Sequence, residues 1–132
     1  MKTLLIGLTL LSSISIMASD CSVFLESKII VGTDSAKAIA KVEKELTEKG
    51  YSVTYDQGVA SYVVELEARA QRGYIQNVGI ERPATGIATL IRNDGKVNIK
   101  RENNSSWSLM PRAKAQSLMV ESARALPRCS EI

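Results

Sequence analysis

The chain has 132 residues, of which 17 are lysine or arginine and 14 are aspartate or glutamate, so its formal net charge is +3. A basic excess this small gives no reason to expect a nucleic-acid partner. The chain has no histidine and only two cysteines, which excludes the commonest general base and an ordinary zinc site.

The N-terminal segment has the shape of an export signal. Lys2 precedes an apolar run over residues 4–11, and a second apolar stretch over 14–17 leads to Ala18. A transmembrane helix needs about 20 consecutive apolar residues, and this run is shorter and interrupted by serines. We therefore expect a signal peptide over residues 1–18, cleaved after Ala18, with a cut after Ser19 as the alternative. The mature chain, residues 19–132, is then one domain in a bacterial periplasm or secreted from the cell.

The two cysteines, Cys21 and Cys129, lie near the two ends of the mature chain. Exported proteins commonly hold their cysteines as disulfides, so we expect a bond between these two. The alternative is that Cys21 is the lipidated first residue of a bacterial lipoprotein. Asp20 puts a charge directly before the thiol, which departs from a lipoprotein signal. We therefore expect no lipid anchor.

A strand and a helix are predicted at the start of the mature chain. Residues 22–31 form a short apolar stretch typical of a strand. Thr33 and Asp34 offer capping side chains for a helix that begins near Ala36, where apolar positions recur at helical spacing. Gly50 is expected to end this helix, because glycine takes the left-handed cap conformation without penalty.

Two strands follow, over residues 51–55 and 62–70, with a turn at 56–58 between them. In the second strand apolar and charged residues alternate, which is the pattern of a half-buried antiparallel strand. Glu65 and Glu67 lie on its polar face, at a separation that a pair of glycosidase carboxylates can use. A flat, solvated face favours ion pairs with basic neighbours instead, so we expect no catalytic residue there.

The second half of the chain contains a hairpin. Residues 85–92 have strand character, and Asp94-Gly95 is a strong hairpin signal before a returning strand over 97–101. We expect residues 102–106 to be a polar loop. No motif of a nucleophile, a phosphate-binding loop or a cofactor site is found, so we expect neither an enzyme nor a cofactor.

The last element is a helix, with Pro111 in its first turn and Pro127 at its end. The complete order is β-α-β-β-β-β-α. It predicts an α+β fold in which an antiparallel four- to five-stranded sheet carries both helices on one face.

Two features are candidates for contact with a partner. The segment 73–83, predicted to be a hairpin, is more apolar than a surface connection needs to be, and a lone tryptophan stands in a polar loop. The alternative interpretation is that both pack against the protein's own core. The residues concerned are Tyr74, Ile75, Val78, Ile80 and Trp107.

The helix ending in Lys49-Gly50-Tyr51, followed by a strand that opens at residues 60–64 with Ala-x-Tyr, resembles small α+β envelope proteins of Gram-negative bacteria. These include lipoproteins of the penicillin-binding-protein-activator and curli-assembly kinds. The resemblance covers about the first half of the mature chain. It implies a non-enzymatic accessory role and transfers no site residue.

The sequence therefore predicts an exported, disulfide-closed accessory protein that binds an envelope or extracellular protein. The alternative is a small secreted inhibitor, or a ligand- or glycan-binding protein, that uses the 73–83 hairpin or the Trp107 loop. Nucleic acid is not expected as a partner, and the pattern does not fix an oligomeric state.

Overall fold

The computed structural model describes residues 21–70, 83–106 and 108–132. The predicted signal peptide lies outside the described residues. Five strands, two helices and two short 3₁₀ turns make up the described part: β1 (Ser22–Ile30), α2 (Ser35–Glu48), β2 (Ser52–Thr54), η1 (Gln57–Val59), β3 (Tyr62–Ala70), β4 (Ala84–Arg92), β5 (Asn98–Ser105), α3 (Pro111–Arg124) and η2 (Cys129–Glu131).

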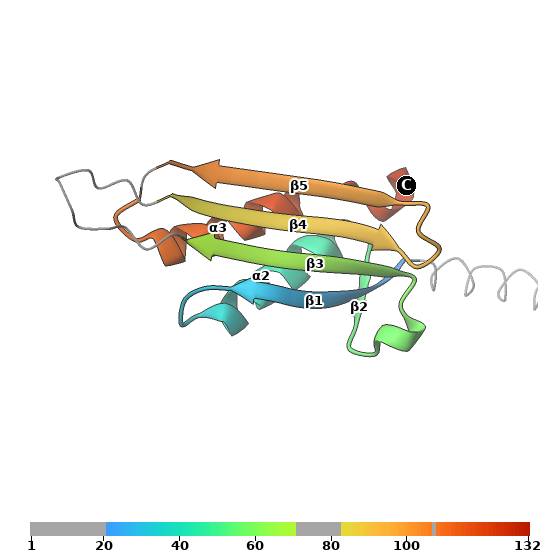
Figure 1. Cartoon of the computed structure of the whole chain (residues 1–132). Helices are drawn as coiled ribbons and strands as arrows, with labels where there is room; N and C mark the ends of the chain where they lie inside the picture. The colour runs from blue at the N-terminus through green and yellow to red at the C-terminus, as the bar shows by residue number, and fades with distance from the viewer. Residues whose placement is uncertain (1–20, 71–82, 107) are drawn as a thin grey trace, which may run out of the picture.

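The strands form one sheet in the order β2-β1-β3-β4-β5, and both helices lie on the same side of it (Figure 1). The predicted α+β class and element order are confirmed. The strand directions differ in part from the prediction, because β1 runs parallel to both of its neighbours, β2 and β3. Two connections are the cause: α2 carries the chain back between β1 and β2, and the segment 55–61 carries it back between β2 and β3, whereas a tight turn would reverse the chain.

The core lies between the sheet and the helices. In β3 the residues Tyr62, Val64, Leu66 and Ala68 are buried and those between them are not, so the predicted alternation is confirmed. α2 adds a buried stripe at helical spacing, and α3 contributes a broader one. The buried helix residues are Ala38, Val42, Leu46, Ala115, Leu118, Met119, Val120, Ser122 and Ala123.

α3 contacts the backbone of β4 directly at Gly86. A Cβ atom placed on Gly86 would lie 2.0 Å from the backbone nitrogen of Met119, so only glycine fits at this crossing. Ser122 is the buried polar residue beside it. Its hydroxyl donates to the Gly86 carbonyl at 2.8 Å and accepts from the Asn103 amide at 2.9 Å, so its hydrogen-bonding capacity is met.

The helix ends follow the sequence signals in most respects. Gly50 has φ +89° beyond the end of α2, and Pro111 is in the first turn of α3. Asp34 stands at the N-cap of α2, but its side chain makes no capping hydrogen bond there. The predicted side-chain cap is therefore wrong, and the helix begins without one.

The hairpin at Asp94-Gly95 is confirmed, since β4 and β5 pair antiparallel on either side of it. The predicted loop over residues 102–106 is wrong, because β5 continues to Ser105 and pairs with β4 along its whole length. An outer strand with solvent on one edge needs no apolar alternation to be stable, so its polar composition resembled a loop.

The two ends of the described chain are joined by a disulfide between Cys21 and Cys129, whose Cα atoms are 6.0 Å apart. Two hydrogen bonds hold the C-terminal segment in the same place. The backbone nitrogen of Cys129 donates to the Lys49 carbonyl at 3.0 Å, and the Tyr51 hydroxyl donates to the Pro127 carbonyl at 2.8 Å. This end of the sheet is thus closed by covalent and polar links together.

Candidate functional site

The sheet face opposite the helices has no covering element from the described part of the chain (Figure 1). We call it the open face. Cross-strand register places Phe24 opposite Val63, and Val63 opposite Ile91. Residues directly opposite one another share a face, so these three partly exposed side chains form an apolar row across β1, β3 and β4.

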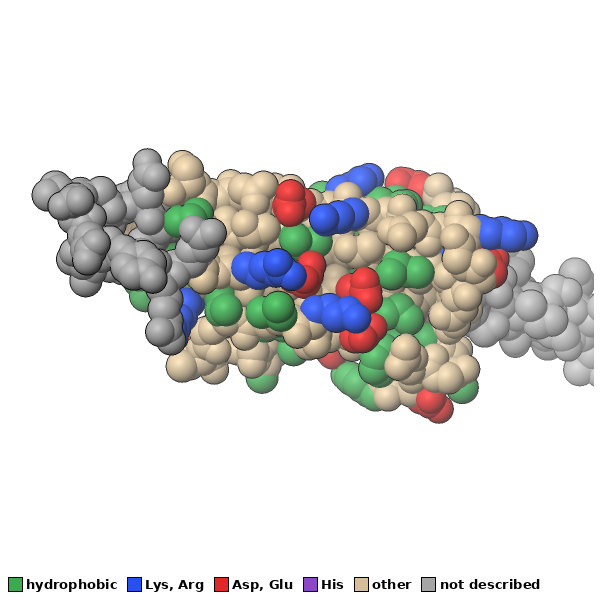
Figure 2. All heavy atoms as spheres, in the orientation of Figure 1, with side chains coloured by type: hydrophobic (Ala, Val, Ile, Leu, Met, Phe, Trp, Pro, Cys, Tyr) green, Lys and Arg blue, Asp and Glu red, His purple; other side chains and the backbone are tan. Residues whose placement is uncertain are grey.

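Charged side chains occupy the middle of the open face. Figure 2 shows acidic and basic groups interspersed there, with apolar side chains gathered toward the end where β1 and β3 begin. Glu26 stands opposite Glu65 on the neighbouring strand, and like charges in that position repel. Lys28 resolves the conflict, because its Nζ lies 3.2 Å from Glu26 and 3.1 Å from Glu65.

A bulge in β1 places Lys28 there. The register shifts between Ser27 and Ile29, so Lys28 is the extra residue with no partner in β3. Hydrogen bonds that Lys28 donates to Glu65 and, with a smaller effect, to Glu26 raise the pKa of Lys28 above its ordinary value. The lysine remains cationic as pH rises past the point at which a free lysine would lose its proton.

The two glutamates considered as a carboxylate pair each have a basic partner. Glu65 is bound by Lys28, and Arg69 Nη2 lies 2.6 Å from Glu67 Oε1. Both therefore belong to an ion-paired surface. Among the described residues no group of three His, Cys, Asp or Glu is arranged to hold a metal ion.

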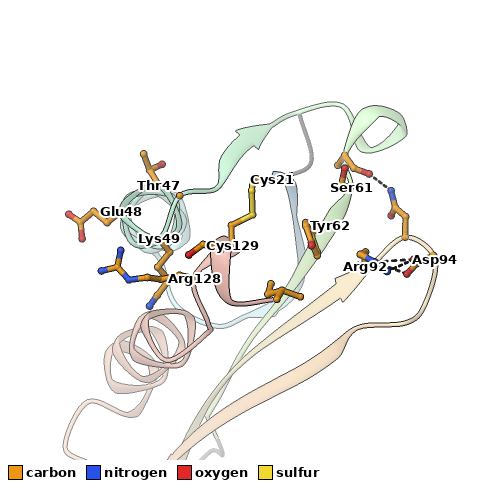
Figure 3. Close-up of a pocket in the computed structure, with 15 residues that line it drawn as sticks. Cys21, Thr47, Glu48, Lys49, Ser61, Tyr62, Arg92, Asp94, Arg128 and Cys129 are labelled. Atoms are coloured by element: carbon orange, nitrogen blue, oxygen red, sulfur yellow. Dashed lines mark hydrogen bonds and ion pairs between the residues drawn. A yellow bond between two sulfur atoms is a disulfide. The ribbon is translucent and has the colours of Figure 1, made fainter. Parts of the chain in front are cut away.

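A second feature is a depression of about 970 Å³ at the disulfide end of the sheet. Its walls come from the end of α2, the start of β3, the β4–β5 turn and η2. Figure 3 shows Arg92 and Asp94 on one side of this depression and Lys49 and Arg128 on the other, with the disulfide between the two groups. Basic side chains thus stand on both walls.

The wall formed by the β4–β5 turn is fixed by an ion pair. Arg92 donates to Asp94 through Nε at 2.9 Å and through Nη2 at 2.6 Å, a bidentate geometry. This guanidinium, with help from the backbone N–H of Lys96, lowers the pKa of Asp94 to about 2. Asn93 anchors the turn to the start of β3, since its side-chain amide donates to the Ala60 carbonyl.

Tyr62, which lines the depression, packs against a second buried tyrosine, Tyr51. The rings of Tyr51 and Tyr62 meet edge to face with centroids 6.0 Å apart, a favourable arrangement for aromatic pairs. Burial raises the pKa of Tyr51 to about 12. At neutral pH this phenol is therefore a hydrogen-bond donor to Pro127 and holds the C-terminal segment in place.

Apolar surface and charged side chains both line the depression. Its cationic groups are Arg92, Lys49 and Arg128, of which Arg92 is occupied by Asp94. Lys49 and Arg128 therefore supply the basic groups that a ligand could meet. The acidic side chain on the same rim is that of Glu48, near the end of α2.

The residues predicted to contact a partner lie outside the described residues: Tyr74, Ile75, Val78, Ile80 and Trp107. The predicted disulfide between Cys21 and Cys129 is present. The apolar row and the depression were not foreseen. Alternation in β3 signalled a polar face, but Phe24, Val63 and Ile91 come together only through strand pairing that is remote in sequence.

No helix within the described ranges is long and apolar enough to cross a membrane. No family model matches the chain, and a search of curated proteins finds no match either.

Two solved structures resemble the fold at low identity. A PelC dodecamer from Paraburkholderia phytofirmans is 16% identical with a TM-score of 0.47, and covers 81% of this chain and 86% of that chain. A minor lipoprotein from Acinetobacter baumannii is 13% identical with a TM-score of 0.41, over 79% of this chain and 84% of that chain. At these identities the likeness is one of fold alone.

Proposed function

We propose that the protein is an exported, non-enzymatic accessory protein that acts through contacts with another protein of a bacterial envelope. The observation that carries this proposal is the open face, where an apolar row stands beside a belt of paired charges. Protein-binding surfaces combine an apolar patch with polar groups beside it, and here the apolar row lies at one end of the face next to the charged middle.

The arrangement of charges supports binding more than catalysis. Acids that act in catalysis are held in clefts, whereas Glu65 and Glu67 lie on a strand face beside Lys28 and Arg69. Rigid strands hold the apolar row in a fixed geometry. A preorganised surface loses little entropy when a partner binds.

We also propose that Cys21 carries no lipid. The sulfur that a lipid would modify is bonded to Cys129, and one sulfur atom cannot be in both a disulfide and a thioether. Intact mass of the exported protein tests this directly: we expect the mass of the unmodified chain less two hydrogens. A mass increased by acyl chains would contradict it.

Affinity capture from crosslinked envelope and culture supernatant tests the main proposal. The bait is the tagged mature chain, and the matched variants are Phe24→Asp in the apolar row and Tyr55→Asp outside it. Tyr55 is 80% exposed and its hydroxyl bonds to Glu43 of α2. It follows Thr54, the partner of Phe24, but points to the helix side of the sheet, so it is a nearby aromatic control that lies off the open face.

We expect the wild type and Tyr55→Asp to capture the same protein and Phe24→Asp to lose it. Urea unfolding of each variant separates loss of binding from loss of the fold. Equal capture by both variants would show that the open face is not the binding surface.

A ligand-binding protein is the second candidate, and the depression at the disulfide end favours it. If the wild type captures no protein, the polar rim formed with Lys49 and Arg128 becomes the site to test. Binding of an anionic glycan that is lost in a Lys49→Ala, Arg128→Ala double variant would support this alternative.

A further inference from the structure

β5 is the outer strand of the sheet, and no other strand of the described residues pairs with its outer edge. The backbone nitrogen of Arg92 donates to the Val97 carbonyl, so this pair is a hydrogen-bonded one. Antiparallel pairs alternate between bonded and non-bonded. The N–H and C=O groups of residues 98, 100, 102 and 104 therefore point away from β4.

The carbonyl of Lys100 provides an independent sign of this direction. It accepts a long contact of 3.4 Å from Nη1 of Arg101, an exposed side chain. The guanidinium can reach this oxygen because the oxygen faces outward at the edge. An outer strand of eight residues whose outward N–H and C=O groups pair with no strand of the described residues is a template for another strand.

The charges on β5 complement one another under a two-fold rotation. An axis through Arg101 that is perpendicular to the sheet places Lys100 of each copy opposite Glu102 of the other. Within the described chain neither Lys100 nor Glu102 forms an ion pair. Moving the axis by one residue either way puts lysine against lysine or glutamate against glutamate, so charge selects this register.

We propose that a second copy of this chain pairs antiparallel along β5 in this register and extends the sheet across the two-fold axis. Four residue pairs, each exchanging two bonds, supply about eight main-chain hydrogen bonds. A lysine on a sheet edge usually discourages pairing. Here Glu102 of the second copy gives each Lys100 an opposite charge. The lysine therefore disfavours pairing with other strands but not with a second copy of this chain.

Arg101 limits the strength of this association. It lies on the axis opposite its own copy, where like charges repel. Its Nε is bonded to the Ala125 carbonyl at 3.2 Å, which draws the guanidinium back over the end of α3. Its contact with the Lys100 carbonyl must break before a second strand can bond to that oxygen. The dimer is therefore reversible and depends on concentration and salt.

Sedimentation equilibrium of the exported protein at low salt tests the proposal with a charge swap. Each single reversal, Lys100→Glu or Glu102→Lys, turns two attractive cross-strand pairs into repulsive ones, so we expect an increase of about 30-fold in the dimer dissociation constant. The double variant Lys100→Glu, Glu102→Lys recreates opposite charges and restores the wild-type constant. Lys41→Glu, an exposed reversal on α2, leaves it unchanged.

A proline gives a second route to the same answer. Lys100→Pro removes an N–H that points away from β4, so the hairpin keeps its own ladder while the second copy loses a donor at the centre of its pairing. We expect this variant to be folded by circular dichroism and monomeric.

The proposal is overturned if the wild type is monomeric up to about 1 mM, if the single reversals and the proline leave a dimer intact, or if the double variant fails to restore it. These measurements use the isolated protein, so they do not depend on whether the open face captures a partner. The two proposals can therefore fail separately.

Discussion

Replacing Gly86 by alanine tests the account of how α3 contacts the sheet. The added Cβ would lie 2.0 Å from the Met119 nitrogen and 2.2 Å from the Leu118 carbonyl carbon. Ordinary contacts begin near 3.4 Å, so helix and strand must separate by about 1.4 Å. The groups in the way are backbone atoms, which cannot rotate aside.

The separation has two costs. It strains a core packed at crystal-like density, which is worth about 1–3 kcal/mol or more. It also lengthens the bond from Ser122 to the Gly86 carbonyl, and an unmet buried polar group costs about 1–3 kcal/mol. We expect the Gly86→Ala variant to lose about 3–5 kcal/mol of its free energy of unfolding, a large part of the 5–15 kcal/mol, roughly, of a typical domain.

Urea unfolding followed by circular dichroism measures this loss as a lower midpoint at unchanged slope. Gly58→Ala is the matched control. The added Cβ there lies 3.3 Å from the Asp56 carboxylate, a flexible side chain at the surface, so a change within about 0.5 kcal/mol is expected. If Gly86→Ala unfolds at the wild-type urea concentration, the direct contact between α3 and β4 is wrong.

Three further predictions concern the closed end of the sheet. Replacing both Cys21 and Cys129 by serine should lower the free energy of unfolding by about 4–5 kcal/mol, because the disulfide spans 108 residues and constrains the unfolded chain; urea unfolding of the variant, and of the reduced wild type, checks this. The pKa of Asp94 is lowered to about 2, so its stabilising effect is complete above the unfolded value near 3.9 and is lost as pH falls toward 2. Thermal midpoints of the wild type and Asp94→Asn should therefore differ at neutral pH and converge in acid, and a constant difference would contradict this. Burial raises the pKa of Tyr51 to about 12, so its contribution persists up to pH 10, approximately, and is lost as pH approaches 12; Tyr51→Phe should flatten this alkaline loss while costing about 1 kcal/mol at neutral pH.

The local parts of the fold could be predicted from the sequence because their signals are local. Apolar alternation over residues 62–70 determines which face of β3 is buried, and Asp94-Gly95 places a hairpin. Gly50 ends a helix because its backbone takes φ +89°. Each of these is a property of a few neighbouring residues, and tertiary packing did not override it.

The remote parts could not be predicted in the same way. The insertion of β1 between β2 and β3 follows from pairings between residues 30 to 39 positions apart, and local pattern carries no information about them. Glu102 resembled a loop residue because β5 is solvated on one edge. The need for glycine at position 86 was equally hidden, since it arises from a helix more than 30 residues later in the chain.

The open face and the β5 edge are related if both proposals hold. Residues paired across a two-fold axis perpendicular to a sheet lie on the same side of it, so the open faces of the two copies would form one continuous surface. That surface would carry two apolar rows, one from each copy. A partner with two binding segments would then gain avidity without any new contact.

If the two open faces form one surface, Phe24→Asp and Glu102→Lys should have different effects on partner binding. Phe24→Asp removes a contact and should weaken even a one-to-one complex with a single partner segment. Glu102→Lys lies on the edge strand, away from the apolar row, and should spare that one-to-one affinity while lowering the apparent affinity for a surface densely coated with the partner. If Glu102→Lys weakens both equally, β5 is part of the partner-binding surface itself, and a strand of the partner takes the place of the second copy.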